Sequence, residues 1–461
     1  MFRLLEKRLA VPGYSPISMD SRDPHTVECG FKKRLLRDVP EPNNEFLEEF
    51  KAFVYQWCSD NLPQVQPMQF EEWLSSTSYT EPRKDELRLA YDQNKGSRPS
   101  AATCSRVSTF VKSEFYPALK HCRMINSRCD QAKVFFGPRV KAVEKVVFEL
   151  PQFIKHVPVQ DRPAYILRMK QAGRKYYATD YTAFESHFTP AFLDACECQL
   201  FRWCLQSDDD CEFMCQVLMG KNIMKTRTGI KASVHGRRMS GDMNTSLGNG
   251  FSNYLLSLFL VHKKGGEMDG VFEGDDGLFY STVELTGSDY EKIGFTIKIE
   301  EVSDPCAASF CGMIFSESGE IIRDPRKFFQ GFAWTSSCIH GGRGVMNELL
   351  RAKSLSAVYE TPQCPIVGAL SRRGLALTRG VTPRFIRDGY HDVIADHASK
   401  FPRFSPSPDT RQLFAKMYGI SPTDQIVVED MIQSGDMGAI AMIIPPTEDQ
   451  EWYTSRYVCE A

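Results

Sequence analysis

Two adjacent carboxylates, Asp275 and Asp276, stand between Gly274 and Gly277 in the stretch 271–280. The residues on either side are apolar or aromatic, which predicts two strands joined by a tight turn at Gly274-Asp275. Neighbouring carboxylates at a hairpin tip repel each other unless a counter-charge is present, and a divalent metal ion is the usual one. An exposed tip with polar residues accounts equally well for these residues taken alone.

A third candidate ligand, Asp180, follows a predicted short strand over 174–179. A strand end would hold its side chain rigidly. Glu185 comes five residues later, on the turn into a helix predicted over 190–203 with Thr189 as its N-cap. A surface turn explains both acids equally well when the segment is viewed alone.

The stretch 240–250 combines glycines with small hydroxyl and amide residues, and a long apolar helix is predicted to continue from it to about Val261. Glycines permit close backbone approach, while hydroxyls and amides direct hydrogen bonds. Ser240, Thr245 and Asn249 are therefore candidates for ligand contacts. Helix capping by Asn244 or Thr245 is the structural alternative, but it does not explain the polar residues that follow within the helix.

Cations gather in two places. The stretch 110–148 is the most basic, and its strand-like alternation would turn Lys112, Arg123 and Arg128 towards a triphosphate or an RNA backbone. From charge alone, a solvated edge strand is the better interpretation. The loop 75–84 carries hydroxyls and ends in Arg83 and Lys84, which suits phosphate contacts as well as it suits a solvated loop before a helix.

The elements that must position these residues differ along the chain. Residues 1 to about 45 read as an extended arm, followed by a helix over 43–61. From about Phe332 the pattern is helical, and several of the predicted helices begin with Ser or Thr followed by Pro. The helices predicted there are 345–359, 365–378, 382–401, 407–418 and 421–435.

Bulk properties set limits. A chain of 461 residues needs more than one core, and its net charge of −2 provides no global basic field for nucleic acid. Fifteen scattered cysteines indicate free thiols in a reducing compartment. A zinc site is conceivable, but no CxxC pair supports it; its candidates are His187, Cys196, Cys198, Cys204, Cys211 and Cys215.

The first residues carry charge and lack the apolar segment of a signal peptide, and the longest apolar run, 255–261, is too short to span a bilayer.

The chain resembles the palm of a viral RNA-dependent RNA polymerase in the order of three motifs, Asp180, Ser240-Gly241 and Gly274-Asp275-Asp276. The sequences of these motifs are similar to those of the tombusvirus- and nodavirus-like lineage of positive-strand RNA viruses. The stretch 240–249 is the most specific match, and 273–276 strengthens it. Other stretches resemble further motifs of that lineage: 112–114 with 123–128 the triphosphate-handling motif, 79–84 the loop through which template enters, 310–312 the primer grip, and 349–356 with 359–362 the start of the thumb. The resemblance covers about residues 75–380.

The resemblance implies an α+β, right-hand fold with an antiparallel palm sheet and a helical thumb. The implied divisions are an N-terminal arm 1–45, fingers 46–165, palm 166–190, a fingers insertion 191–235, palm 236–330 and thumb 331–461.

The chemistry it implies is template-directed RNA synthesis by two-metal-ion nucleotidyl transfer, with Mg²⁺ or substituting Mn²⁺. Asp180, Asp275 and Asp276 would hold the metal, and Lys298 or Lys292 would be the general acid. Lys112, Arg123 and Arg128 would cradle the triphosphate; Glu185, Ser240, Thr245 and Asn249 would read the 2′-hydroxyl; Tyr79, Arg83, Lys84 and Gly241 would contact RNA. Relatives usually have Asp where this chain has Glu185, which reaches one methylene further.

The implied partners are an RNA template, nascent RNA, ribonucleoside triphosphates and other viral replication proteins. The implied location is the host cytoplasm, at membrane-associated sites reached through another protein or segment. A reverse transcriptase and an inactive palm serving as an RNA-binding scaffold remain alternatives. Trp452, Tyr453 and Tyr457 fit either stacking on an initiating base or a place in the thumb core.

Overall fold

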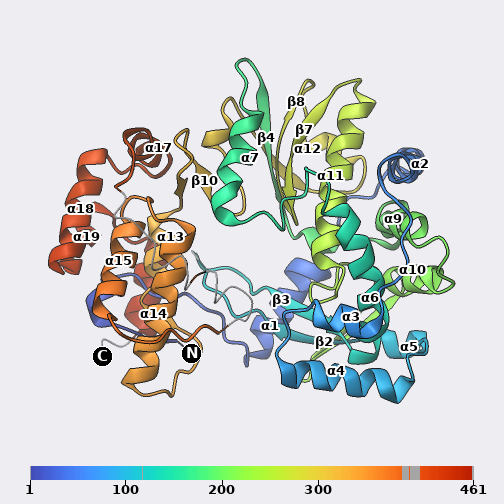
Figure 1. The fold of residues 1–461 in the computed structure, drawn as a ribbon, viewed down its shortest axis with the longest axis horizontal. Helices are drawn as coiled ribbons and strands as arrows, with labels where there is room; N and C mark the ends of the chain where they lie inside the picture. Colours follow the sequence, from blue (N-terminus) through green and yellow to red (C-terminus); the bar gives the residue numbers. More distant parts are fainter. Residues whose placement is uncertain (1, 117, 387–393, 395–404, 459–461) are drawn as a thin grey trace.

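The computed structural model describes residues 2–116, 118–386, 394 and 405–458, and Figure 1 shows their arrangement. Within these residues helices combine with mostly antiparallel strands, which confirms the predicted mixture of helix and antiparallel sheet. Two sheets have four strands, ordered β7-β8-β4-β9 and β3-β2-β5-β6, and two more have two strands each. No helix among the described residues is long and apolar enough to cross a membrane.

The first four-stranded sheet is wholly antiparallel and consists of β4 (Lys175–Tyr181), β7 (Met268–Glu273), β8 (Asp276–Ser281) and β9 (Ile297–Val302). Side chains of a strand alternate between its two faces. Tyr177 packs on the side of helix α11 (Thr245–Lys263), whereas Tyr176 packs with Ile166 of helix α7 (Arg162–Met169) on the other. The sheet is therefore buried on both faces, so polar side chains of its strands can reach a ligand only at the strand ends.

The second sheet contains β2 (Arg106–Val111), β3 (Met124–Arg128), β5 (Lys221–Thr226) and β6 (Lys231–His235). Strands β2 and β5 run parallel, and the other pairs are antiparallel. Its buried face, including Val107 and Met124, packs against Val27 of helix α1 (Pro24–Gly30) and Phe31 just beyond it. The strand predicted over 122–128 is thus present as β3, whereas the one predicted over 111–114 is wrong, since β2 ends at Val111.

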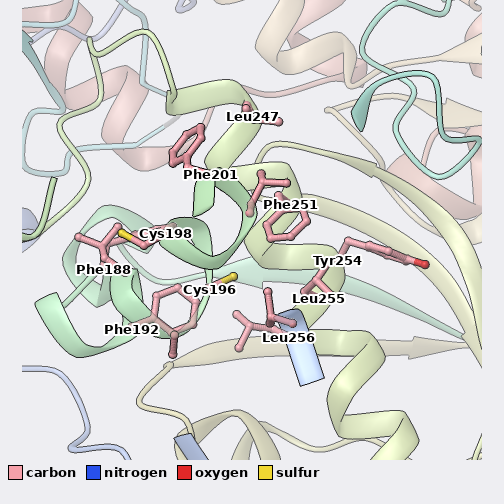
Figure 2. Packing of buried hydrophobic residues seen from close by; sticks show 14 of the residues in the cluster. Phe188, Phe192, Cys196, Cys198, Phe201, Leu247, Phe251, Tyr254, Leu255 and Leu256 are labelled. Carbon is pink, nitrogen blue, oxygen red and sulfur yellow. The ribbon is translucent and has the colours of Figure 1, made fainter. Parts of the chain in front are cut away.

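The largest core joins α11 to helices α2 (Asn44–Asn61), α6 (Asp130–Val147), α8 (Pro190–Ala195), α9 (Glu197–Cys204) and α10 (Cys211–Met219). Figure 2 shows Phe192, Cys196 and Phe251 interdigitating there. The predicted helix over 190–203 is interrupted at Cys196, whose φ of −116° and ψ of −85° are not helical, while Thr189 caps its start as expected. Helix α6 lies in the basic stretch, where only strands were predicted.

The C-terminal part is helical, as predicted, and forms a separate core. Its elements are α13 (Pro325–Gly331), α14 (Arg343–Glu360), α15 (Val367–Leu377), α17 (Pro408–Tyr418), α18 (Pro422–Ser434), α19 (Met437–Ile443) and α20 (Glu448–Tyr457). The helix predicted over 382–401 lies largely outside the described residues. Ser421 caps α18 by accepting a hydrogen bond from the Asp424 N–H, with proline in the first turn.

The N-terminal arm is packed against the rest of the chain along its length. Strand β1 (Arg3–Leu4) pairs with β12 (Trp334–Thr335), and the Tyr14 hydroxyl donates to the Ile444 carbonyl at 3.1 Å. Figure 1 shows the arm running from the C-terminal helices towards the second sheet. It therefore connects regions that are far apart in the sequence.

Shorter elements complete the fold. They are η1 (Lys7–Leu9), η2 (Phe31–Leu35), α3 (Phe70–Ser75), α4 (Glu81–Asn94), α5 (Ala101–Cys104), η3 (Val159–Asp161), η4 (Phe184–His187), α12 (Gly287–Glu291), η5 (Pro305–Ala307), β10 (Ile314–Phe315) and β11 (Ile321–Ile322).

Candidate active site

The acids Asp180, Glu273, Asp275 and Asp276 form one end of the first sheet, called here the acidic edge. The last pair between β4 and β8 is Thr179 with Gly277, so Asp180 and Asp276 stand one position beyond it on neighbouring strands. Residues at opposed positions share a face of the sheet. Strands β7 and β8 meet at the predicted turn, where Gly274 has a φ of +63° that favours glycine.

Asn253 of α11 fastens this turn from within the core. Its fully buried side-chain amide donates to the carbonyls of Asp275 at 3.0 Å and Gly274 at 3.3 Å. The Thr179 hydroxyl donates to the same Asp275 carbonyl at 3.1 Å, and the Tyr181 hydroxyl donates to Asn253 Oδ1 at 3.1 Å. The turn's backbone is thereby fixed, while the Asp275 side chain stays exposed.

Electrostatics at the acidic edge favour a cation. Burial, followed by the negative charge of Asp275, raises the pKa of Asp276 to about 7, and the charges of Glu273 and Asp180 act in the same direction. Carboxylate oxygens are the ligands that Mg²⁺ prefers, so the donor chemistry fits this ion. No group of three or more His, Cys, Asp or Glu side chains in the described part of the chain is gathered closely enough to hold a metal. Binding would therefore require the acidic side chains to converge.

The two candidate general acids differ in position. Lys298 on β9 is the direct cross-strand partner of Asp180 and is exposed. Lys292 instead pairs with Asp289 at 3.3 Å. Of these two candidates, Lys298 is therefore the one beside the acidic edge.

The loop 240–245 is docked onto β3. The Ser240 hydroxyl donates to the Met124 carbonyl at 2.9 Å, and the Gly241 N–H donates to the Asn126 carbonyl at 2.8 Å. A Cβ at Gly241 would lie 2.9 Å from that carbonyl oxygen, so the close approach requires glycine here. The Thr245 hydroxyl donates to the Asp242 carbonyl at 2.9 Å, and Asn244 occupies the N-cap position without a side-chain capping bond.

The half-buried Asn249 joins three buried residues, Glu197, Arg238 and Asn244, in a group called here the arginine network. Arg238 Nη2 donates to Glu197 Oε2 at 2.6 Å, and Arg238 Nε donates to Asn249 Oδ1 at 2.9 Å. Asn244 Nδ2 donates to the other Glu197 oxygen at 2.6 Å. The partner of Asn249 is therefore Arg238.

Glu185 is held by the N-terminal arm. Arg34 Nε and Nη2 donate to its two carboxylate oxygens at 2.6 and 3.0 Å. Both side chains are about one-fifth exposed. The carboxylate of Glu185, which the extra methylene carries further from the backbone, is thus held in a bidentate ion pair by Arg34 of the arm.

Of the three cations predicted to meet a triphosphate, two remain accessible. Lys112 and Arg123 lie opposite each other just beyond the last pair of β2 and β3, and they share Glu114, at 3.0 and 3.6 Å. The side chain of Arg128 is only 3% exposed; it donates to Asp242 at 2.6 Å and to the Cys104 carbonyl at 2.7 Å. A triphosphate contact from Arg128 would require this buried pair to break.

The predicted RNA-binding residues Tyr79, Arg83 and Lys84 lie at and just before the first turns of α4. The Tyr79 hydroxyl contacts the Met243 sulfur at 3.6 Å, Arg83 pairs with Asp130, and Lys84 pairs with Glu81 at 2.8 Å. Tyr79 thereby connects this loop to the loop 240–245.

The zinc hypothesis finds no support among the described residues. The cysteines of α8 to α10 are buried free thiols within the largest core, and Figure 2 shows Cys196 and Cys198 among apolar side chains. Burial raises the pKa of the Cys196 thiol. The His187 ring stacks on Phe295, and its Nε2 accepts from the Thr296 N–H at 3.0 Å. These residues serve packing.

Sequence reasoning missed four residues that organise the site: Arg34, Glu197, Arg238 and Asn253. Asn253 carried a usable signal, since an amide inside an apolar helix needs buried partners. Glu197 and Arg238 carried a weaker signal: each is a charged residue among apolar neighbours that indicate burial, so each needs a buried partner of opposite charge. Nothing local to Arg34 indicates its partner 151 positions away.

A family described as "Viral RNA dependent RNA polymerase" matches residues 25–439 of the chain. The RNA-directed RNA polymerase of Striped jack nervous necrosis virus is 25% identical over 206 residues, which are 42% of this chain and 21% of that relative. The RNA-directed RNA polymerase of Groundnut rosette virus (strain MC1) is 24% identical over 400 residues, which are 76% of this chain and 45% of that relative. The matches thus span less than half of either relative, and the family match includes the acidic edge and the arginine network.

Proposed function

Because the chain belongs to the family of viral RNA-dependent RNA polymerases, we propose that it copies an RNA template into RNA from ribonucleoside triphosphates and so replicates a positive-strand viral genome. The observation that carries this proposal is the acidic edge: Asp180 and Asp276 stand side by side on antiparallel strands beside the turn that bears Asp275. Such an array suits nucleotidyl transfer assisted by two metal ions.

The proposed architecture is a right hand. The sheet with the acidic edge belongs to a palm of 166–190 and 236–330, and the second sheet to fingers of 46–165 and 191–235. The C-terminal helices belong to a thumb of 331–461, and residues 1–45 are the arm. Two four-stranded sheets beside a helical C-terminal part support this division.

In the proposed mechanism Asp180 and Asp275 would hold two Mg²⁺ ions, with Asp276 assisting. Bound there, the ions would supply a lower pKa for the primer 3′-hydroxyl and positive charge for the departing pyrophosphate. The strand end and the turn fixed by Asn253 hold the backbone that carries the carboxylates, and positioning of this kind is the main contribution a protein makes to phosphoryl transfer. Lys298, beside Asp180, donates a proton to the pyrophosphate.

On the nucleotide side, Lys112 and Arg123 contact the triphosphate from the edge of the second sheet. Arg128 joins them only if its pair with Asp242 opens. Ser240, Thr245, Asn249 and Glu185 surround the ribose, whose 2′-hydroxyl distinguishes RNA precursors from DNA precursors.

Template RNA meets Tyr79, Arg83, Lys84 and Gly241, and other viral replication proteins are further partners. The proposed location is the host cytoplasm, at membrane-associated sites reached through another protein or segment.

The test is incorporation of labelled ribonucleotide on a poly-ribonucleotide template, with and without Mg²⁺. RNA synthesis that needs both Mg²⁺ and template supports the proposal. Preferential use of deoxynucleotides would favour a reverse transcriptase, and template binding without incorporation would favour an inactive RNA-binding scaffold. Asp275→Asn, assayed in parallel, distinguishes the chain's own activity from a contaminant.

A further inference from the structure

Arg238 connects the two segments that bear the candidate ribose residues. Its backbone N–H donates to the Glu185 carbonyl at 3.0 Å, and its Nε donates to Asn249 Oδ1 at 2.9 Å. The side chains of Arg238 and its partner Glu197 are 2% and 0% exposed. One buried residue therefore fixes both the main chain at Glu185 and the side chain of Asn249.

The guanidinium of Arg238 is closely packed between the Phe188 ring and the helix start at Gly248. Its Cζ lies 4.1 Å from the centre of the Phe188 ring. A Cβ at Gly248 would lie 2.4 Å from Arg238 Nη2 and 2.6 Å from both Glu197 carboxylate oxygens. Because no larger side chain fits at Gly248, the helix start and the ion pair are in direct contact, and Arg238 has little freedom to turn.

The direction of the hydrogen bond determines how Asn249 is oriented. A guanidinium has only donors, so the Asn249 atom that it meets must be the carbonyl oxygen. The NH₂ group of Asn249 consequently points away from Arg238, and Asn249 is half-buried rather than sealed in the core. The NH₂ group is then the part of Asn249 that faces away from Arg238 and can donate to a ligand, while one lone pair of the oxygen is engaged by Arg238.

We propose that Arg238 is a positioning residue for sugar selection: it fixes the Asn249 amide so that its NH₂ group donates to the ribose 2′-hydroxyl oxygen. This inference rests on the proposed function. The hydroxyl's own proton is then free for an acceptor, and Glu185 supplies a carboxylate on the segment that Arg238 also holds. A deoxyribose offers no oxygen to the oriented amide, so it loses this hydrogen bond.

The buried ion pair is consistent with this role. Replacing a buried ion pair by apolar side chains is often neutral or stabilising, so stability alone does not account for it. Beside Asn249 it supplies orientation, because a planar guanidinium can bond a carboxylate and an amide oxygen at once, whereas a lysine ammonium has no such fixed fork.

The experiment compares Kd values for ATP and 2′-deoxyATP in the full chain, with Ca²⁺ so that no turnover occurs, and incorporation ratios with Mg²⁺. Asn249→Asp keeps the oxygen for Arg238 and removes the donor, so we expect the preference for ATP to fall about tenfold, the value of one hydrogen bond. Arg238→Lys should lower it by a similar factor. The neighbouring Arg237→Lys is the matched control and should leave it unchanged.

A double-mutant cycle separates positioning from general damage. If Arg238 acts through Asn249, adding Arg238→Lys to Asn249→Ala changes the ATP preference no further. Additive losses, or an unchanged preference in Arg238→Lys, would overturn the inference. If Arg238→Lys does not fold, the double variant Glu197→Gln with Arg238→Gln replaces it, because it removes both charges together. This variant should also lower the ATP preference by itself and change it no further when Asn249→Ala is present.

The binding ratio also keeps the two proposals apart. Wild-type protein that prefers ATP in binding but incorporates nothing would overturn the proposed function and leave the role of Arg238 supported by the cycle. Wild-type protein that binds both nucleotides equally would overturn the role of Arg238, whether or not it makes RNA.

Discussion

Arg34 and Glu185, 151 positions apart, form a bidentate ion pair that ties the N-terminal arm to the segment following strand β4. Two parallel N–H···O bonds fix the direction of a carboxylate as well as its charge. The arm therefore contributes to the candidate site although residues 1–45 contain none of the predicted ligands.

Replacing Arg34 by alanine tests this contribution. Because the pair is partly exposed, we expect the free energy of unfolding to fall by no more than about 1 kcal/mol. The released Glu185 should no longer be held in one direction, so the incorporation ratio of ribo- to deoxynucleotides should drop severalfold. Lys33→Ala, an exposed cation next to it, should change neither quantity; an equal effect there would assign the result to arm charge alone.

Removal of the acidic side chains should abolish activity without unfolding the protein. Asp180→Asn and Asp275→Asn should each lower the single-turnover rate of incorporation at least about a thousandfold, since metal ligands support several kcal/mol of transition-state stabilisation. Thermal melting should be unchanged or slightly raised, because like charges are removed from one edge. Near-normal incorporation in either folded variant would refute the ligand assignment.

Lys298 and Lys292 form a matched pair of exposed lysines. Lys298→Gln should lower the rate of chemistry about a hundredfold, the usual contribution of a general acid. Lys292→Gln should retain the rate, since that side chain is directed to Asp289. The reverse order of effects in single-turnover assays would reassign the acid.

Asn253 should be costly to replace. Asn253→Ala removes the donors to the Gly274 and Asp275 carbonyls in a buried setting, so we expect a loss of about 2–4 kcal/mol in denaturant unfolding. Ser257→Ala, one turn along the same helix and also buried, should cost only about 1 kcal/mol. If Asn253→Ala kept full activity, the turn would not need this support.

Acid should destabilise the protein through His187. Burial lowers the pKa of His187 from 6.5 to about 4. In the unfolded chain His187 therefore takes up a proton below about pH 6.5, whereas in the folded protein it does so only below about pH 4. The contribution of His187 to the free energy of unfolding is fully present above pH 6.5. It falls by about 3 kcal/mol as the pH decreases from 6.5 to about 4.

The measurement is urea unfolding from pH 7 to pH 4. His187→Gln retains a side-chain acceptor for the Thr296 N–H and should show a shallower pH dependence than wild type. The exposed His262→Gln should keep the wild-type dependence. Identical curves for all three proteins would mean that other groups dominate.

Local patterns in the sequence predicted much of this fold. The turn at Gly274-Asp275, the cap at Thr189 and the helices of the C-terminal part depend on neighbouring residues, and the structure has them. Helix α6 was missed because its cations suggested an exposed strand, whereas Phe135, Val143 and other apolar residues bury one of its faces.

Arg128 was misread for a related reason. Strand alternation places Arg128 on the face of β3 that holds Met124 and Asn126 and so opposite to Arg123, which makes the expectation of a common side wrong. The charge of Arg128 also suggested that its face meets solvent. The face is in fact buried, and Asp242 supplies the counter-charge from a loop more than a hundred positions away. Pairings of that range depend on the packing of whole layers, which periodicity along one segment does not encode.

The packing of the arm has a consequence for the order in which this protein can complete its fold. Arg3, Tyr14 and Ser15 find their partners at Thr335, Ile444 and Gln450, which are made more than three hundred residues later. Contacts of such long sequence separation form slowly. During synthesis residues 3–15 therefore lack these partners until the segment 334–450 has been made, and a chain that ends before this segment lacks the residues that would hold them.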